Sequence, residues 1–204
     1  MTQNQQETPT VFIVDDDPAI RFAMQALMDS VNVEHEIYSS GDEFLESVDD
    51  HRAGCLVLDI RMPGLGGLEL QEELIKRDST LPIIFITGHG DVPMAVDAMQ
   101  KGAVDFIQKP FRDQDLLDRI REALKTDAER REEQQKHAEV AERLDRLTNR
   151  EREVFDLVVT GKPNKVIAYE LGVSQRTVEI HRAREMEKMQ ARSLADLVKM
   201  HMTA

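Results

Sequence analysis

The run Cys55-Leu56-Val57-Leu58 is apolar throughout and ends abruptly in Asp59. A second apolar run, Val11-Phe12-Ile13-Val14, ends in the same way in Asp15, Asp16 and Asp17. Short, uniformly apolar runs are typical of parallel strands that are covered on both faces of a sheet. Carboxylates that end two such strands are expected in one acidic pocket at one edge of the sheet. Oxygen groups of this kind bind hard divalent cations, and one carboxylate can remain free as a nucleophile.

The first 124 residues repeat one pattern five times, a short apolar run followed by an amphipathic stretch. Strands that alternate with helices predict an α/β fold with a doubly wound parallel sheet. Ligands of such folds bind beyond the carboxyl ends of the strands, where the strand order reverses. The predicted strands are 10–14, 35–38, 54–59, 82–86 and 104–107, and the predicted helices are 18–29, 41–48, 66–77, 92–101 and 112–124.

Charge is unevenly distributed along the 204 residues, whose net charge is −13. Residues 1–124 carry 10 basic and 24 acidic side chains, whereas residues 148–204 carry 10 basic and 8 acidic ones. An acidic part joined to a slightly basic part predicts two modules with different partners. The single cysteine, Cys55, cannot form an intramolecular disulfide, which favours a reducing compartment. The sequence lacks the patterns of a secretion signal or membrane span, so we expect a cytoplasmic protein with no membrane partner.

Residues 125–147 are polar, and acidic residues recur four positions before basic ones, as in Glu132 with Lys136 and Glu142 with Arg146. Pairs at this spacing stabilise an exposed helix. We therefore expect a helical linker that continues the last helix of the first module. A partly frayed, solvated segment is the alternative.

The last part of the chain has the pattern of four helices. Thr148-Asn149-Arg150-Glu151 is a capping-box sequence, which predicts the start of a helix. Gly172 separates predicted helices at 164–171 and 175–190 into a helix–turn–helix, and Ser174 can cap the second of them. A final helix is predicted at 194–202. The predicted domains are therefore 8–124, a linker at 125–147, and an all-α domain at 148–204.

Two further side chains are predicted at the same edge of the sheet as Asp15, Asp16 and Asp59. Thr87 follows the apolar run Ile83-Ile84-Phe85-Ile86, and Lys109 follows Asp105-Phe106-Ile107-Gln108, so both lie at strand ends. Phosphoryl transfer to a carboxylate explains this set of groups. The carboxylate forms an aspartyl-phosphate, and Mg²⁺ on oxygen ligands offsets charge on the phosphoryl oxygens. The lysine adds a positive charge, and the hydroxyl reports the new phosphate.

With these residues, positions 8–124 resemble the receiver domains of two-component response regulators. The resemblance implies a flavodoxin-like, doubly wound, five-stranded parallel sheet. It also implies that Asp59 is the phosphoacceptor, and that Asp15, Asp16, Asp59 and the backbone carbonyl of Arg61 hold Mg²⁺.

The same resemblance assigns the groups that respond to the phosphate. It implies that Thr87 is the switch hydroxyl and that Lys109 contacts the phosphate. It further implies that Phe106 is the switch aromatic, which turns inward as Thr87 moves. A cis peptide bond is expected before Pro110, where it places Lys109.

Residues 148–202 resemble LuxR-type helix-turn-helix domains. A receiver joined to such a module is the arrangement of the NarL/FixJ family, and Gly88-His89-Gly90-Asp91 resembles its FixJ-like members. The LuxR-type similarity is carried by the runs 147–154 and 164–168 and by Leu171, Val173, Ser174, Thr177, Val178 and His181.

This second resemblance makes Gln175–Met189 the recognition helix, with its first half in the major groove of DNA. Glu179 could accept from a cytosine amino group, and Ile180 could contact a thymine methyl. Glu185 departs from the apolar residue expected on the inner face of this helix. The predicted DNA-binding residues are Lys165, Gln175, Arg176, Thr177, Glu179, Ile180, Arg182 and Ala183, of which Lys165, Arg176, Thr177 and Arg182 are expected at phosphates.

The sequence thus predicts a transcription factor that a histidine kinase phosphorylates on Asp59. We expect the phosphorylated receiver to dimerise and the paired modules to bind two promoter half-sites, with RNA polymerase as a further partner. No enzymatic activity is expected beyond Mg²⁺-dependent, self-catalysed phosphotransfer to Asp59. One alternative is a haloacid-dehalogenase-like phosphatase that uses Asp15 and Asp17, and another is a regulator that uses the receiver only as a dimer scaffold.

Overall fold

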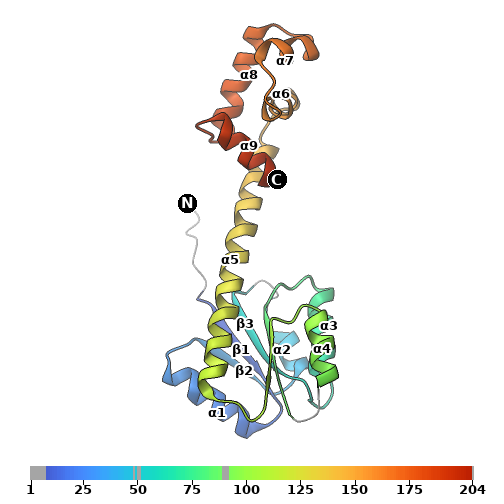
Figure 1. Cartoon of the computed structure of the whole chain (residues 1–204), viewed down its shortest axis with the longest axis vertical. Helices are drawn as coiled ribbons and strands as arrows, with labels where there is room; N and C mark the ends of the chain where they lie inside the picture. The colour runs from blue at the N-terminus through green and yellow to red at the C-terminus, as the bar shows by residue number, and fades with distance from the viewer. Residues whose placement is uncertain (1–7, 48, 50–51, 89–91, 204) are drawn as a thin grey trace. The chain divides into compact units, whose positions relative to one another are not determined.

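The computed structural model describes residues 8–47, 49, 52–88 and 92–203 (Figure 1). The chain divides into two compact units, Met1–Arg130 and Arg131–Ala204. Three residues of the FixJ-like run, His89, Gly90 and Asp91, lie outside the described residues. Within the described ranges, no helix is both long enough and apolar enough to cross a bilayer.

The first unit contains five strands, β1 (Thr10–Val14), β2 (His35–Tyr38), β3 (Gly54–Asp59), β4 (Ile83–Thr87) and β5 (Asp105–Gln108). They form one parallel sheet in the order β2-β1-β3-β4-β5. The order reverses between β1 and β3, as in flavodoxin-like folds, so the predicted fold class is confirmed. Val14 lies opposite Leu58 in this pairing, which brings the residues after both strands to the same edge.

Helices cover both faces of this sheet: α1 (Pro18–Ser30), α2 (Gly41–Ser47), α3 (Gly67–Lys76), α4 (Val92–Gln100) and α5 (Asp113–Asp145). Phe12, Leu56 and Phe85 pack on one face with residues of α2, α3 and α4. Ile13 and Val57 face the opposite way and pack with α1 and α5. Successive side chains of a strand point to opposite faces, so burial on both sides requires uniformly apolar strands. That requirement explains the runs before Asp15 and Asp59.

Strands β4 and β5 each begin and end one residue later than the sequence pattern predicts. Pro82 has no N–H to donate, although its carbonyl accepts from the amide of Leu56 at 2.8 Å. The fourth strand therefore begins at Ile83, and Thr87 is its last residue rather than the residue after it.

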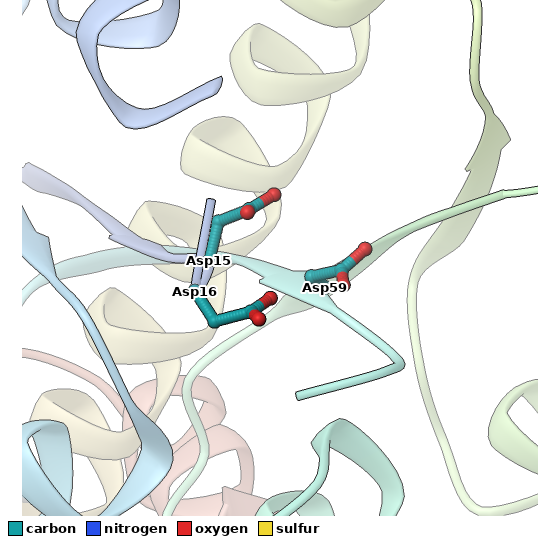
Figure 2. A group of neighbouring side chains, drawn as sticks. All are labelled: Asp15, Asp16 and Asp59. Carbon is teal, nitrogen blue, oxygen red and sulfur yellow. The ribbon is translucent and has the colours of Figure 1, made fainter. Parts of the chain in front are cut away.

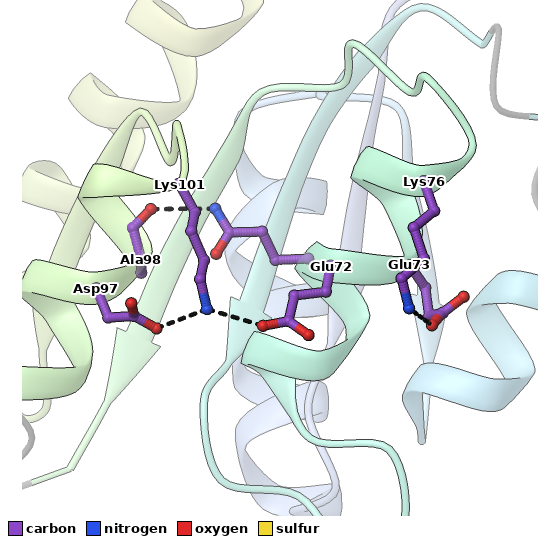
Figure 3. A network of polar contacts seen from close by, with 7 residues as sticks. Glu72, Glu73, Lys76, Asp97, Ala98 and Lys101 are labelled. Atoms are coloured by element: carbon purple, nitrogen blue, oxygen red, sulfur yellow. Dashed lines mark hydrogen bonds and ion pairs between the residues drawn. The ribbon is translucent and has the colours of Figure 1, made fainter.

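Polar side chains join α3 to α4 (Figure 3). Lys101 Nζ lies 2.8 Å from a carboxylate oxygen of Glu72 and 2.8 Å from one of Asp97. The buried Gln71 of α3 donates its Nε2 to the carbonyl oxygen of Ala98 in α4 at 3.1 Å. Exposed ion pairs contribute little, whereas a buried amide that lost its partner would be destabilising. The Gln71 bond therefore contributes more to holding the two helices together.

The second unit contains α6 (Asn149–Val159), α7 (Asn164–Leu171), α8 (Gln175–Lys188) and α9 (Leu194–Thr203). Thr148 and Glu151 form the predicted capping box at the start of α6, and Ser174 caps α8 by accepting from the amide of Thr177. Gly172 ends α7 in the left-handed conformation, with φ of 66°. The core of this unit joins all four helices to the end of α5 through Val140, Leu144, Val154, Phe155, Val158, Ile167, Val178, Met189 and Leu197.

Replacing Thr148 with Ala should lower the free energy of unfolding of the second unit by about 1 kcal/mol. The change removes the hydroxyl that accepts from the amide of Glu151, and this amide has no acceptor within the helix. Urea unfolding of the full chain, followed by circular dichroism, measures the difference. Thr160→Ala at the other end of α6 is the matched control, because Thr160 donates to the carbonyl of Leu157 and caps no amide. Equal losses in both variants would contradict the capping argument.

Candidate functional site

Three carboxylates lie together at the carboxyl ends of β1 and β3 (Figure 2). Asp15, Asp16 and Asp59 each offer an oxygen, and these oxygens all lie within 4.8 Å of one another. Asp15 and Asp59 are buried, at 2% and 8% exposure, whereas Asp16 is exposed. The structure therefore brings together the acids that the sequence predicted at this edge, with one of them open to solvent.

Backbone bonds hold the turn that presents Asp15. The amide of Asp15 donates to the carbonyl of Tyr38 at 3.3 Å, and its Oδ1 accepts from the amide of Asp17 at 2.9 Å. Asp17 itself points elsewhere, because its Oδ1 accepts from the amide of Ala19 at 2.8 Å and caps α1. Asp17 is thus a capping residue outside the acidic cluster.

Lys109 reaches the cluster from the loop after β5. Its Nζ lies 2.8 Å from Asp15 Oδ2 and 3.0 Å from Asp59 Oδ1. Its amide donates to the carbonyl of Thr87 at 2.7 Å, which holds the residue beside the end of β4. The following bond to Pro110 is cis, as predicted. One ammonium group therefore bridges two buried carboxylates that are 44 residues apart in sequence.

The ionisation of Asp59 is set by opposing effects. Burial raises the pKa of its carboxyl most strongly, and the negative charges of Asp15 and Asp16 raise it further. The bond and charge of Lys109 lower it, but the pKa remains above its ordinary value. For Lys109, burial lowers the pKa, yet its bonds to the two carboxylates outweigh burial and leave the pKa raised. Lys109 is therefore held protonated in contact with the acids.

The other predicted receiver residues lie around this cluster. Thr87 is buried at the end of β4, the strand next to β3 in the sheet. Phe106 of β5 is half-buried and packs against the core on the α2–α4 face. Arg61 lies two residues after Asp59, and its side chain is exposed. The structure thus places Thr87 on the strand next to β3 and Phe106 on the following strand of the sheet.

The donor set of the cluster fits a hard divalent cation. Carboxylate oxygens are the ligands that Mg²⁺ and Ca²⁺ prefer, and no softer sulfur or imidazole ligand belongs to the group. The exposed Asp16 leaves a side on which waters can complete the coordination, as Mg²⁺ usually requires.

In the second unit, the predicted base-reading residues lie on the outer face of α8. Glu179, Ile180 and Ala183 are exposed, Ile180 at 46%. Arg182 is half-buried and donates to the side-chain oxygen of Asn164 at 2.6 Å, which links α8 to α7. As placed, Arg182 serves this contact between helices. The remaining predicted DNA-binding residues, Lys165, Gln175, Arg176 and Thr177, lie in the first turns of α7 and α8, and all but the half-buried Thr177 are exposed.

Both parts of the chain match known families. Residues 11–121 match the response regulator receiver domain, and residues 145–201 match the luxR family of bacterial regulatory proteins. The chain is 49% identical over 193 residues to nodulation protein W of Bradyrhizobium diazoefficiens, covering 95% of this chain and 85% of that protein. The chain is a response regulator of the NarL/FixJ family.

Two further relatives of this response regulator match along almost their whole length. It is 43% identical to the transcriptional regulatory protein FixJ of Azorhizobium caulinodans, over 97% of this chain and 94% of that protein. The solved structure of response regulator StyR is 44% identical, with a TM-score of 0.90 over 97% of this chain and 100% of that one. Receivers joined to LuxR-type domains are transcriptional regulators, which implies a kinase partner and DNA binding for this response regulator.

One residue that orders the acidic site of the response regulator was not predicted. Arg21 of α1 donates from its guanidinium to the backbone carbonyl of Asp15 at 2.7 Å. It lies four residues after Asp17, one helical turn into α1, and this spacing is the only signal in the sequence. A cation one turn after an acidic N-cap often serves as ordinary surface charge, so the pattern alone does not reveal the contact.

Proposed function

We propose that a histidine kinase phosphorylates this protein on Asp59, and that the phosphorylated form dimerises and binds promoter DNA. The observation that carries the proposal is the position of Lys109 Nζ, within 3.0 Å of both Asp15 and Asp59. A fixed cation beside the nucleophile stabilises charge that develops during phosphoryl transfer. We further propose a receiver at 8–124, a linker at 125–147 and a DNA-binding domain at 148–204.

The chemistry assigns one role to each group. An oxygen of Asp59 attacks the phosphorus of a phosphohistidine, and a P–O bond forms as the P–N bond breaks. The imidazole leaves with the electron pair and takes up a proton. Lys109 holds its positive charge beside the phosphoryl oxygens throughout. Because Asp59 keeps the phosphoryl group, the protein completes a single transfer and is not a turnover enzyme.

Mg²⁺ held by Asp15, Asp16, Asp59 and the carbonyl of Arg61 would offset the charge on the phosphoryl oxygens. The oxygen donors gathered around one point support this assignment. Arg21 and Asp17 support it indirectly, because both bond to Asp15 and fix the turn that carries two of the donors.

The new charge on Asp59 would be sensed by its neighbours. Thr87 ends the strand that pairs with β3, and movement of its hydroxyl toward the phosphate would open space for Phe106 to turn inward. The face that changes includes α4, where Val96 and Met99 expose 51% and 43% of their surface. Apolar side chains on a face that is remodelled favour a second receiver as the partner. Two paired domains would then bind two half-sites and engage RNA polymerase in the cytoplasm.

The phosphatase alternative fits the structure less well. It requires Asp15 and Asp17 as the acting pair, but Asp17 caps α1 and lies outside the acidic cluster. The third member of the cluster is Asp59, which that alternative leaves without a role.

Beryllofluoride, which mimics a phosphoryl group on a carboxylate, tests the proposal directly. With Mg²⁺ and beryllofluoride, we expect the mass of the full chain in solution to double and its affinity for promoter DNA to rise. Light scattering measures the mass, and fluorescence anisotropy measures affinity for fragments that the activated protein selects from genomic DNA. Unchanged mass and unchanged affinity would contradict the proposed switch. Asp59→Ala treated in the same way controls for effects of the reagent elsewhere.

A further inference from the structure

The buried face of α8 contains a carboxyl group with no hydrogen-bond partner. The buried residues of this helix are Val178 and Glu185, and its C-cap Met189 is buried as well. Spacings of seven and then four positions place all three on one face of the helix. Glu185 is 0% exposed, and within the described part of the chain neither of its carboxylate oxygens has a partner. Val178 and Met189 belong to the apolar core that seats α8. Glu185 therefore stands where an apolar side chain would complete the packing.

The surroundings of this carboxyl oppose its ionisation. Burial is the largest effect and raises the pKa of Glu185 from 4.5 to about 7. Arg182 on the same helix attracts the charged form, whereas Glu151 and Asp156 of α6 repel it. Among the described residues of α7 and α9, no charged group contributes to this shift. The His181 ring lies one turn earlier on α8, and its Nδ1 is also buried without a partner.

The charge of Lys188, the lysine of α8, is already engaged. Its Nζ donates to Glu151 at 2.6 Å and to the carbonyl of Arg146 at 3.0 Å. Because no cation of the described residues forms an ion pair with Glu185, the carboxyl fits the core well only when it is protonated. An uncharged acid can remain buried, but an ionised one without partners draws the helix toward solvent.

We propose that Glu185 is a proton-controlled positioning residue, which seats the recognition helix when protonated and loosens it when ionised. The proposal rests on the proposed DNA-binding function, because α8 carries the base-reading residues Glu179, Ile180 and Ala183 on its opposite face. DNA binding by this protein then weakens as the pH rises.

The direction of the pH effect, and the pH range in which it acts, follow from the two protonation states of Glu185. The seated helix retains a proton that the loosened or unfolded state releases, since the ordinary value of 4.5 is below the folded value of about 7. Seating is therefore strongest below about pH 4.5, weakens as the pH rises toward 7, and is constant above that value. With one proton involved, the equilibrium between the seated and the loosened helix changes by at most about tenfold for each pH unit.

Full-length wild type, Glu185→Gln and Glu187→Gln provide the test, because Glu187 is an exposed acid on the same helix. Affinity for the selected promoter fragments is measured from about pH 6 to about pH 8 at constant ionic strength. We expect the affinity of wild type relative to Glu185→Gln to fall by up to about tenfold between pH 6 and 7 and then to become constant. Glu187→Gln should follow wild type.

A measurement on unaltered protein keeps the test independent of how the variant folds. The side-chain carbon resonance of Glu185 in carbon-13-labelled protein reports its titration, and we expect a midpoint near 7. A midpoint near 4.5, or a constant ratio of wild-type to Glu185→Gln affinity, would overturn the proposal. A chain that binds no DNA at any pH contradicts the proposed function instead. In that case, the pH dependence of the unfolding midpoint of wild type and Glu185→Gln tests the role of Glu185 without DNA.

Discussion

Replacing Asp59 with Asn should reduce labelling of the protein by radioactive acetyl phosphate to background. Asn has nearly the shape of Asp, but its amide cannot form the acyl phosphate at this position. Asp15 and Asp16 remain in the variant, and Asp15 also accepts from Lys109 at 2.8 Å, so loss of the label would assign the phosphoryl group to Asp59. Gel electrophoresis with a phosphate-binding matrix measures the labelled fraction over time.

Asp17→Asn is the matched control for this variant. Asp17 belongs to the same acidic run but lies outside the cluster, and Asn serves nearly as well as Asp as a helix N-cap. The control should therefore fold and label as wild type does. Label retained by Asp59→Asn, or lost to the same extent in Asp17→Asn, would contradict the assignment of the nucleophile.

Replacing Lys109 with Ala should slow labelling of Asp59 by about 10²–10³-fold, the effect of removing one preorganised charge from a transition state. The group removed lies 3.0 Å from the nucleophile and 2.8 Å from Asp15. Lys101→Ala is the control, because Lys101 is also paired with two acids, Glu72 and Asp97, at a distance from the site. An equal effect of both substitutions would show that loss of a paired lysine acts through stability alone.

The pH dependence of labelling gives a second readout of Lys109. Among the described protein groups, Lys109 is the one that lowers the pKa of Asp59, while burial, Asp15 and Asp16 raise it. Removing Lys109 therefore raises this pKa further, and a smaller fraction of the nucleophile is ionised at a given pH. We expect the rate profile of Lys109→Ala to move to higher pH than that of wild type. A profile that moved to lower pH would contradict the electrostatic role of this lysine.

Local patterns in the sequence determined much of the fold. The apolar runs before Asp15 and Asp59 predicted buried parallel strands, because no polar side chain can be placed on either face of such a strand. The capping residues Thr148 and Ser174 predicted helix starts, since a cap bonds to an amide two or three residues away. The strand ends also predicted the acidic cluster, because parallel strands finish at one edge.

Contacts between distant residues were decided only by the tertiary structure. Asp127 of α5 accepts from the amide of Gly54 in β3 at 2.9 Å, although 73 residues separate them. The bond from Arg21 to the carbonyl of Asp15 depends on the orientation of a helix relative to a strand end, which no local pattern specifies.

Glu185 shows most clearly the difference between what the sequence determines and what the tertiary structure decides. The sequence identified it as an acid where an apolar residue was expected, but could not say whether it was buried. Its complete burial and missing partners follow from the packing of α8 against the other helices of its unit. Helix caps and strand patterns depend on residues only a few positions apart, so they can be recognised in the sequence. Burial, pairing and pKa depend on how separate elements are packed together, so they emerge only from the folded chain.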